Sequence, residues 1–229
     1  MIEPKELRIE ISAVKLTKFQ KQYMNLATKN AHLDSTIPEC RVFRYMRQRN
    51  KYAELKIMCK RKQDLERSFM EWAYNLAERS LKQKYQQFGF RWQKNSSYAD
   101  LFLKWARYLI AYEPSTYYPV GYIFFRFEVA KGHTAVTIYG LHVEESYRNL
   151  GLGTHMMKTL EILAHRLGVE VLIIGIAKRD EALKRFLHRL GFTEDKSEMS
   201  INSEYEVLVA PTMCYKIMEA HRTSTISFH

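Results

Sequence analysis

The sequence contains few cysteines and no long apolar run, and both shortages exclude classes of protein. Its three cysteines, Cys40, Cys59 and Cys214, are odd in number and form no C-x-x-C pair. This usage is typical of a reducing compartment, so we expect a cytoplasmic and nuclear location. No segment approaches the ~20 apolar residues that a bilayer-spanning helix needs, and the N-terminus MIEPKELRIE lacks the apolar core of a signal peptide. We therefore expect no membrane association.

Metal-binding patterns are also missing. The eight histidines include no H-E-x-x-H motif, and histidines and cysteines nowhere share the spacing of zinc ligands. We therefore expect no metal. In contrast, the apolar fraction of 46%, with 13% aromatic residues, is sufficient for a large core and argues against a disordered chain.

The net charge of +11 has several possible partners: nucleic acid, an anionic membrane or an acidic ligand. Because lysines and arginines occur throughout the chain, we interpret the charge as a solvated surface with a few phosphate contacts. Residues 41–49 carry four arginines. We interpret this segment as a solvated connection and not as a basic arm that binds nucleic acid. Direct nucleic-acid binding is therefore the less favoured alternative.

Hydrophobic periodicity predicts both helices and strands. Helices are expected where apolar residues recur every three or four positions, around 16–26, 69–88, 156–167 and 183–190. Strands are expected at 53–59, 106–112, 120–129, 135–143 and 169–176, the last of them buried and parallel. Residues 194–206 predict an acidic loop, and Met213, Tyr215 and Ile217 alternate in an expected final strand.

The stretch from Thr134 to Leu167 indicates a binding site for an anion. A strand is followed by the polar bend Glu144–Tyr147, then by the loop Arg148–Thr154, and then by a helix. The N–H groups at the start of a helix lack internal partners and carry partial positive charge. Glycines at 151 and 153 allow the backbone to approach a phosphate closely.

The spacing of the loop excludes two common phosphate sites. A dinucleotide fingerprint needs a third glycine at position 156, which is Met156, and a Walker loop needs lysine after Gly153, which is followed by Thr154. What remains is Arg148-x-x-Gly151-x-Gly153. This motif closely resembles the pyrophosphate loop of the GNAT superfamily of N-acetyltransferases, which bind acetyl-CoA. The run Arg185–Phe192, after the predicted parallel strand, resembles the closing motif of the same fold.

The resemblance implies an α/β fold with a mixed, mostly antiparallel central sheet flanked by helices. We expect residues 1–60 to form an N-terminal helical extension, 61–219 to form the acetyltransferase domain, and 220–229 to be a loose tail. The same resemblance implies acetyl-CoA as the co-substrate.

Several blocks resemble one family within this superfamily, the N-alpha-acetyltransferase D family (NatD). They are Val42–Tyr45, the run from Cys59, Trp72–Leu76, Tyr85, Tyr108–Ala111, Phe125–Glu128 and Ser203–Val207. The similarity extends from about residue 25 to 217. It implies transfer of an acetyl group to the α-amine of histone-like N-termini that begin Ser-Gly-Arg. The implied partner is a protein N-terminus, a histone tail, and the chain is expected to be a monomer.

Roles for individual residues follow from the resemblance alone. The main chain of Leu141, His142 and Val143 would pair with the pantetheine arm, with the Val143 N–H facing the thioester oxygen. The pyrophosphate would be bound by the loop, that is by Arg148, Asn149, Leu150, Gly151, Leu152, Gly153 and Thr154. Asp180 or Arg179 would contact the cofactor arm. Substrate contacts would come from Tyr85, Glu128, Tyr139, Ser197 and Tyr205.

The chain departs from the NatD pattern where the chemistry is done. Gly140 replaces a glutamate thought to be the general base, Thr137 replaces a tyrosine, and Ala130 replaces a second acidic substrate contact. Phe186 occupies the position of a tyrosine acid in many acetyltransferases.

The remaining candidates for the catalytic group are Tyr139, Glu128 and His142. A different protein or small-amine acceptor is one alternative function. A catalytically weak homologue that binds CoA or chromatin is another.

Overall fold

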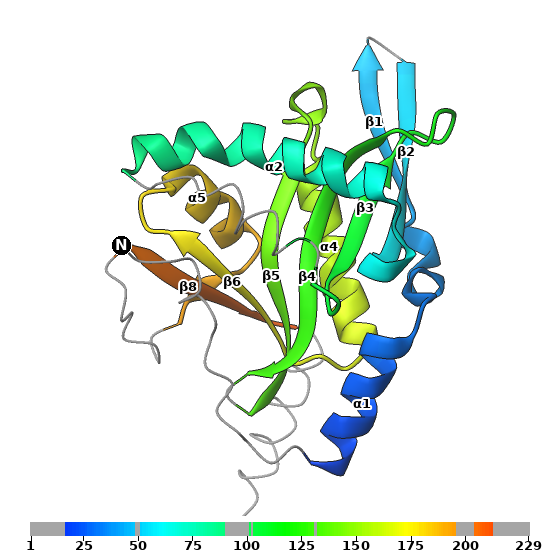
Figure 1. The fold of residues 1–229 in the computed structure, drawn as a ribbon, viewed down its shortest axis with the longest axis vertical. Helices are drawn as coiled ribbons and strands as arrows, with labels where there is room; N and C mark the ends of the chain where they lie inside the picture. The colour runs from blue at the N-terminus through cyan, green and yellow to red at the C-terminus, as the bar shows by residue number, and fades with distance from the viewer. Residues whose placement is uncertain are drawn as a thin grey trace, which may run out of the picture. The chain divides into compact units, whose positions relative to one another are not determined.

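The computed structural model describes residues 17–48, 51–89, 101, 103–130, 132–195 and 204–212. It contains a mixed sheet of eight strands in the order β1-β2-β3-β4-β5-β6-β8-β7, flanked by helices (Figure 1). The expected α/β fold class is confirmed. The described residues of 1–30, 127–138 and 161–229 form one compact unit, and those of 31–126 and 139–160 form another. The proposed domain boundaries at residues 60 and 219 stay predictions.

The second unit contains an antiparallel series of strands covered by a long helix (Figure 1). Its elements are β1 (Val42–Gln48), β2 (Lys51–Arg61), β3 (Arg107–Tyr112), the first part of β4 (Pro119–Ala130) and α2 (Arg67–Gln87), with short 3₁₀ turns at Leu33–Thr36, Pro38–Cys40, Lys62–Asp64 and Glu145–Tyr147. Residues three and four apart on α2 pack against β3 and β4. Two tyrosines in this core keep their hydroxyls satisfied, since Tyr122 donates to the Ala73 carbonyl at 2.8 Å and Tyr108 to the Leu101 carbonyl.

The first unit contains the parallel pair. Its elements are α1 (Lys18–Lys29), the end of β4, the start of β5 (His133–Val143), β6 (Val171–Ala177), α5 (Glu181–Arg189), β7 (Thr193–Glu194) and β8 (Tyr205–Pro211). β6 pairs in parallel with β5 and antiparallel with β8, as its near-continuous apolar sequence predicts. The helix α4 (Leu152–Arg166) contributes to both units.

Residues 42–48 form an edge strand, so the expected solvated connection is wrong. Phe43 and Tyr45 pair with Leu55 and Ala53 of β2, and the positions between them are exposed. The alternation is hard to recognise in the sequence because a segment with several arginines resembles a solvated connection. Charged side chains are nevertheless common on edge strands, where they discourage further pairing.

The prediction of an acidic loop at residues 194–206 is also wrong at its C-terminal end. Residues 205–211 form β8, in which Val207 and Val209 pack against Ile173 of β6. The acidic residues before the strand led to the prediction of a loop, whereas the β-branched residues decide the structure. The expected final strand at 213–217 and the predicted tail at 220–229 lie outside the described residues.

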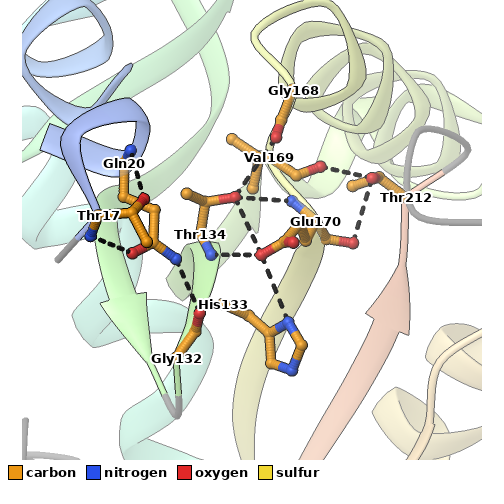
Figure 2. Close-up of polar contacts among 9 residues, drawn as sticks. All are labelled: Thr17, Gln20, Gly132, His133, Thr134, Gly168, Val169, Glu170 and Thr212. Carbon is orange, nitrogen blue, oxygen red and sulfur yellow. Dashed lines mark hydrogen bonds and ion pairs between the residues drawn. The ribbon is translucent and has the colours of Figure 1, made fainter. Parts of the chain in front are cut away.

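A polar network joins β5, β6 and the end of β8 (Figure 2). The Thr134 N–H donates to Glu170 Oε2 at 2.8 Å, and the Glu170 N–H contacts Thr134 Oγ1 at 3.1 Å. Thr212 donates from its own N–H to the Glu170 carbonyl at 2.8 Å and from its hydroxyl to the Val169 carbonyl. Because Thr134 and Thr212 are buried, their donors depend on these partners.

Glu170→Ala is expected to lower the free energy of unfolding by about 1–3 kcal/mol, because the buried Thr134 N–H loses its acceptor. Glu170→Gln keeps an amide oxygen at this place and should cost less than half as much. Urea denaturation of the two variants and the wild type measures the difference. Equal stability of all three would show that the Thr134–Glu170 contact contributes nothing to stability.

In the described part of the chain, no helix is long and apolar enough to span a bilayer. Within the same residues, no group of three potential ligands is placed to bind a metal ion. Cys40 and Cys59 are buried free thiols.

Candidate functional site

The predicted anion loop leads directly from β5 into α4. After Val143 the chain makes the turn Glu145–Tyr147 and passes through two residues in the left-handed region, Asn149 at φ 60° and Gly151 at φ 87°. The helix begins at Leu152, and the Gly151 carbonyl accepts its first hydrogen bond, from the His155 N–H at 3.0 Å. A side chain at position 151 would meet little, since the nearest atom to an added Cβ is Phe43 Cζ at 3.9 Å. The glycine is therefore required by its backbone angle.

The N–H groups of this loop fit a phosphate. Within the described residues, none of the N–H groups of residues 149–154 donates a hydrogen bond to the protein. The loop is largely exposed, and the positive end of α4 adds to its field. Alternating backbone conformations of this kind form an anion-binding concavity. The residues present thus fit the pyrophosphate that the sequence predicts here.

Arg148 lies beside the loop with two contacts. Its Nε donates to the Val143 carbonyl at 2.9 Å and its Nη2 to Ser80 Oγ on α2 at 3.3 Å. These contacts fix the guanidinium between the end of β5 and α2 while the side chain stays exposed. The arrangement leaves further donors of the guanidinium for an anion.

Glu144 connects the loop to α2, and sequence analysis did not identify it. Trp72 donates from Nε1 to Glu144 Oε1 at 2.9 Å, and Arg79 Nη2 reaches both carboxylate oxygens at 2.9 and 3.0 Å. The carboxylate is mostly buried and therefore holds the loop in place. No local pattern reveals this role, because the partners are 65 and 72 residues away in the sequence.

The pairing of β5 with β6 stops before the loop. The ladder extends from Ala135 with Val171 to Ile138 with Ile174, although β5 continues to Val143. Leu141, His142 and Val143 lie beyond the end of this ladder. The pairing of their main chain with the pantetheine arm stays a prediction.

Two of the predicted catalytic side chains contact the same face of β4. Tyr139 lies 5.3 Å from the Phe124 ring and 5.1 Å from the Trp105 ring, between centroids. His142 lies 5.2 Å from the Tyr122 ring. Because Tyr122 and Phe124 are alternate residues of one strand, they share a face. Tyr139 is about half exposed, whereas His142 is 8% exposed.

The His142 imidazole occupies the space next to Gly140. A Cβ added to Gly140 would lie 2.9 Å from His142 Nε2, closer than real contacts allow. A side chain at position 140 would therefore require this imidazole to move. Burial, together with the positive charges of Arg148 and Lys84, lowers the pKa of His142 to about 4. The ring is thus neutral near pH 7.

The third catalytic candidate lies in the other unit. Glu128 is buried on β4 and accepts a hydrogen bond from the buried hydroxyl of Thr137 on β5. Thr137 thus contacts the carboxylate that sequence analysis assigned to the substrate. A buried carboxylate with a hydroxyl partner is suited to bind a cation.

The proximity of the remaining predicted residues to one another stays a prediction. Tyr85 is half-buried near the end of α2, and Tyr205 is the first residue of β8. Ser197 lies outside the described residues. The Asp180 side chain accepts a hydrogen bond from the Leu183 N–H at 3.1 Å and caps α5. Its contact with the cofactor arm stays a prediction.

Known proteins share this fold. The model of the acetyltransferase (GNAT) family matches residues 69–192, more than half of the chain. Tetrahymena GCN5 is similar at 15% identity and a TM-score of 0.56, over 70% of this chain and 98% of that one. The PaiA N-acetyltransferase of Thermoplasma acidophilum, solved with coenzyme A, is 14% identical with a TM-score of 0.52, over 68% and 99%. Ard1 of Thermoplasma volcanium is 15% identical with a TM-score of 0.50, over 69% and 98%.

At these identities the solved structures show the fold, and the family model shows the relationship. The matched range includes β5, the loop from Arg148 to Thr154 and the start of α4. The chain therefore belongs to the GNAT family of acetyl-CoA-dependent acetyltransferases.

Proposed function

We propose that this protein transfers the acetyl group of acetyl-CoA to the α-amine of basic, histone-like protein N-termini of the Ser-Gly-Arg type. The observation that carries the proposal is the pair Gly140 and His142. A weak, neutral base stands where the resembling family has a glutamate. Such a site suits an amine that loses its proton easily.

The cofactor would be bound by one continuous segment. Arg148 and the N–H groups of 149–154 would hold the pyrophosphate, and the main chain of 141–143 would pair with the pantetheine arm. When bound, acetyl-CoA supplies an activated acetyl thioester. Glu144 contributes indirectly, because its contacts with Trp72 and Arg79 keep the loop in position.

His142 would accept the proton that the amine loses as its nitrogen bonds to the acetyl carbon. With a pKa of about 4, the imidazole is too weak a base to deprotonate an ammonium group beforehand. The amine must therefore arrive neutral. At pH 7 about 10% of an α-amine of pKa ~8 is neutral, against about 0.04% of a lysine of pKa ~10.4. The ratio of about 250 favours an N-terminus.

Glu128 would recognise the basic side chain of the substrate. Its carboxylate is buried and is in contact with Thr137, so a guanidinium that reaches it would form a charge-assisted hydrogen bond in a dry environment. This role also explains how a protein of net charge +11 could attract a basic peptide. The attraction would be local and not a property of the whole surface.

A double-mutant cycle tests this recognition. Glu128→Gln is expected to lower kcat/KM for a Ser-Gly-Arg-Gly peptide by about 10–100-fold, the effect of losing one charge-assisted hydrogen bond. For a Ser-Gly-Ala-Gly peptide, wild type and variant should differ by less than about threefold.

Thr137→Val serves as the matched control, because it removes the hydroxyl and keeps the carboxylate, and its effect should be smaller. If Glu128→Gln lowers kcat/KM equally for both peptides, Glu128 does not bind the arginine of the substrate.

A further inference from the structure

The positive charge is concentrated in one part of the chain. Residues 41–62 contain nine lysines and arginines and one glutamate, which is +8 of the total +11. In the structure this segment is largely the β1–β2 hairpin, which forms the edge of the antiparallel sheet of the second unit (Figure 1). This clustering supports direct nucleic-acid binding, which the composition of the whole chain made the less favoured alternative.

One face of the hairpin carries two basic side chains, one carboxylate and the large apolar side chains of Met46 and Tyr52. Val42 is opposite Lys56, Arg44 is opposite Glu54, and Met46 is opposite Tyr52. Arg44 pairs with Glu54 at 2.7 Å, but both side chains are well exposed, so the pair is weak and open to a competing anion. Lys56 forms no ion pair within 4 Å among the described residues, although the hydrogen bond from Arg44 and the charge of Lys56 both lower the pKa of Glu54 on this face.

Exposed aromatic side chains gather at the same end of this unit. Of the six large apolar residues exposed in the described chain, Met46 and Tyr52 lie on the hairpin, and Tyr117 and Tyr118 lie on the turn between β3 and β4. Tyr52 is 71% exposed and Tyr117 is 73% exposed.

The register places this turn next to the hairpin. Tyr117 stacks on Tyr112 with 5.7 Å between centroids, and Tyr112 is directly opposite Lys56 in the β2–β3 ladder. The hairpin and the turn therefore form one surface of cations and flat rings, which we call the basic-aromatic surface. It consists of Arg44, Met46, Tyr52, Glu54, Lys56 and Tyr117.

We propose that the basic-aromatic surface binds single-stranded nucleic acid, an activity beyond the proposed acetyl transfer. Cations along a strand neutralise phosphates, and exposed rings stack on unpaired bases of any sequence. A duplex would satisfy the cations and leave the rings in water, because its bases are already stacked. An acidic peptide offers the charge without flat partners, and a membrane would need a larger apolar area than these four side chains provide.

Fluorescence anisotropy with a labelled single-stranded oligouridylate tests the proposal. If Arg44 and Lys56 contact phosphates, log Kd should change with log salt concentration with a slope of about 1.4, from ~0.7 per contact on single strands. Arg44→Ala/Lys56→Ala should bring the slope close to zero and weaken binding at least about tenfold at low salt. Tyr52→Ala should weaken binding by about 5–100-fold with an unchanged slope, because stacking is not ionic.

The matched control is Lys158→Ala/Arg189→Ala, which removes two exposed cations elsewhere, on α4 and α5. Acetyl-CoA affinity of each variant reports that it is folded. The proposal is supported if only the variants in the basic-aromatic surface lose binding. It is overturned if the control loses as much, if a duplex of the same length binds more tightly, or if anionic lipid vesicles bind and the oligonucleotide does not.

Discussion

Replacing Gly151 with valine is expected to lower the affinity for acetyl-CoA at least about 100-fold. The position has φ 87°, which a β-branched residue rarely adopts, so the loop must change its path and withdraw its N–H groups from the pyrophosphate. Loss of two charge-assisted hydrogen bonds of about 1.5–3 kcal/mol each accounts for an effect of this size. Isothermal titration calorimetry with acetyl-CoA measures it.

Gly132→Val is the matched control, because Gly132 has φ 82°, and a side chain there would meet nothing within 4 Å. It introduces the same backbone strain in the turn before β5, so it should reduce stability and leave cofactor affinity within about threefold. Gly153→Val is a second variant without that strain, since Gly153 lies in the first turn of α4. If Gly153→Val is folded and binds acetyl-CoA normally, the loop does not hold the pyrophosphate.

Replacing His142 with glutamine is expected to lower kcat/KM by about 10–100-fold, less than the ~10²–10⁴-fold of a well-matched general base, because the pKa of His142 is only about 4. Glutamine approximates the volume of imidazole and does not titrate. Tyr139→Phe is the comparison for the neighbouring candidate. It keeps the ring against Trp105 and Phe124 and removes only the hydroxyl, so it should cost less than about tenfold.

The pH dependence separates these roles. Because the pKa of His142 is about 4, the base is already neutral above pH ~5, and the wild-type rate should rise only with the neutral fraction of the amine, to a plateau above pH ~8. His142→Gln should lower the plateau without moving this inflection. An inflection near 6.5 would mean that His142 titrates normally. A rate that is flat from pH 5 to 9 would mean that another group deprotonates the amine beforehand.

Stability provides a readout of His142 that does not depend on activity. The pKa of this group falls from about 6.5 in the unfolded chain to about 4 in the folded one, so between these values the unfolded state binds more protons. The free energy of unfolding should therefore decrease as the pH is lowered from 6.5 towards 4. His142→Gln should lose this part of the pH dependence.

The loop was predictable because all its signals are local. The strand before it, the glycines and the helix after it are visible within 34 consecutive residues, and the structure has each of them in place. The cap at Asp180 and the buried strand β6 were predictable for the same reason.

The features that could not be predicted from the sequence depend on contacts between distant segments. The alternation in β1 is visible only when Phe43 and Tyr45 are known to pair with β2, because the arginines between them resemble a solvated segment. The link between Glu144 and α2 joins residues 65 to 72 positions apart. The relation of His142 to Gly140 could not be inferred from their spacing either, since residues two apart usually do not interact so closely.

The central claim is that the acceptor is an α-amine. One peptide that begins Ser-Gly-Arg-Gly and carries a lysine further along offers both amines to the enzyme at once. After incubation with acetyl-CoA at pH 7, tandem mass spectrometry locates the acetyl group.

The account predicts acetylation of the N-terminal serine, with lysine slower by about 250-fold, the ratio of their neutral fractions. Acetylation mainly on lysine, with the N-terminus unmodified, would contradict it.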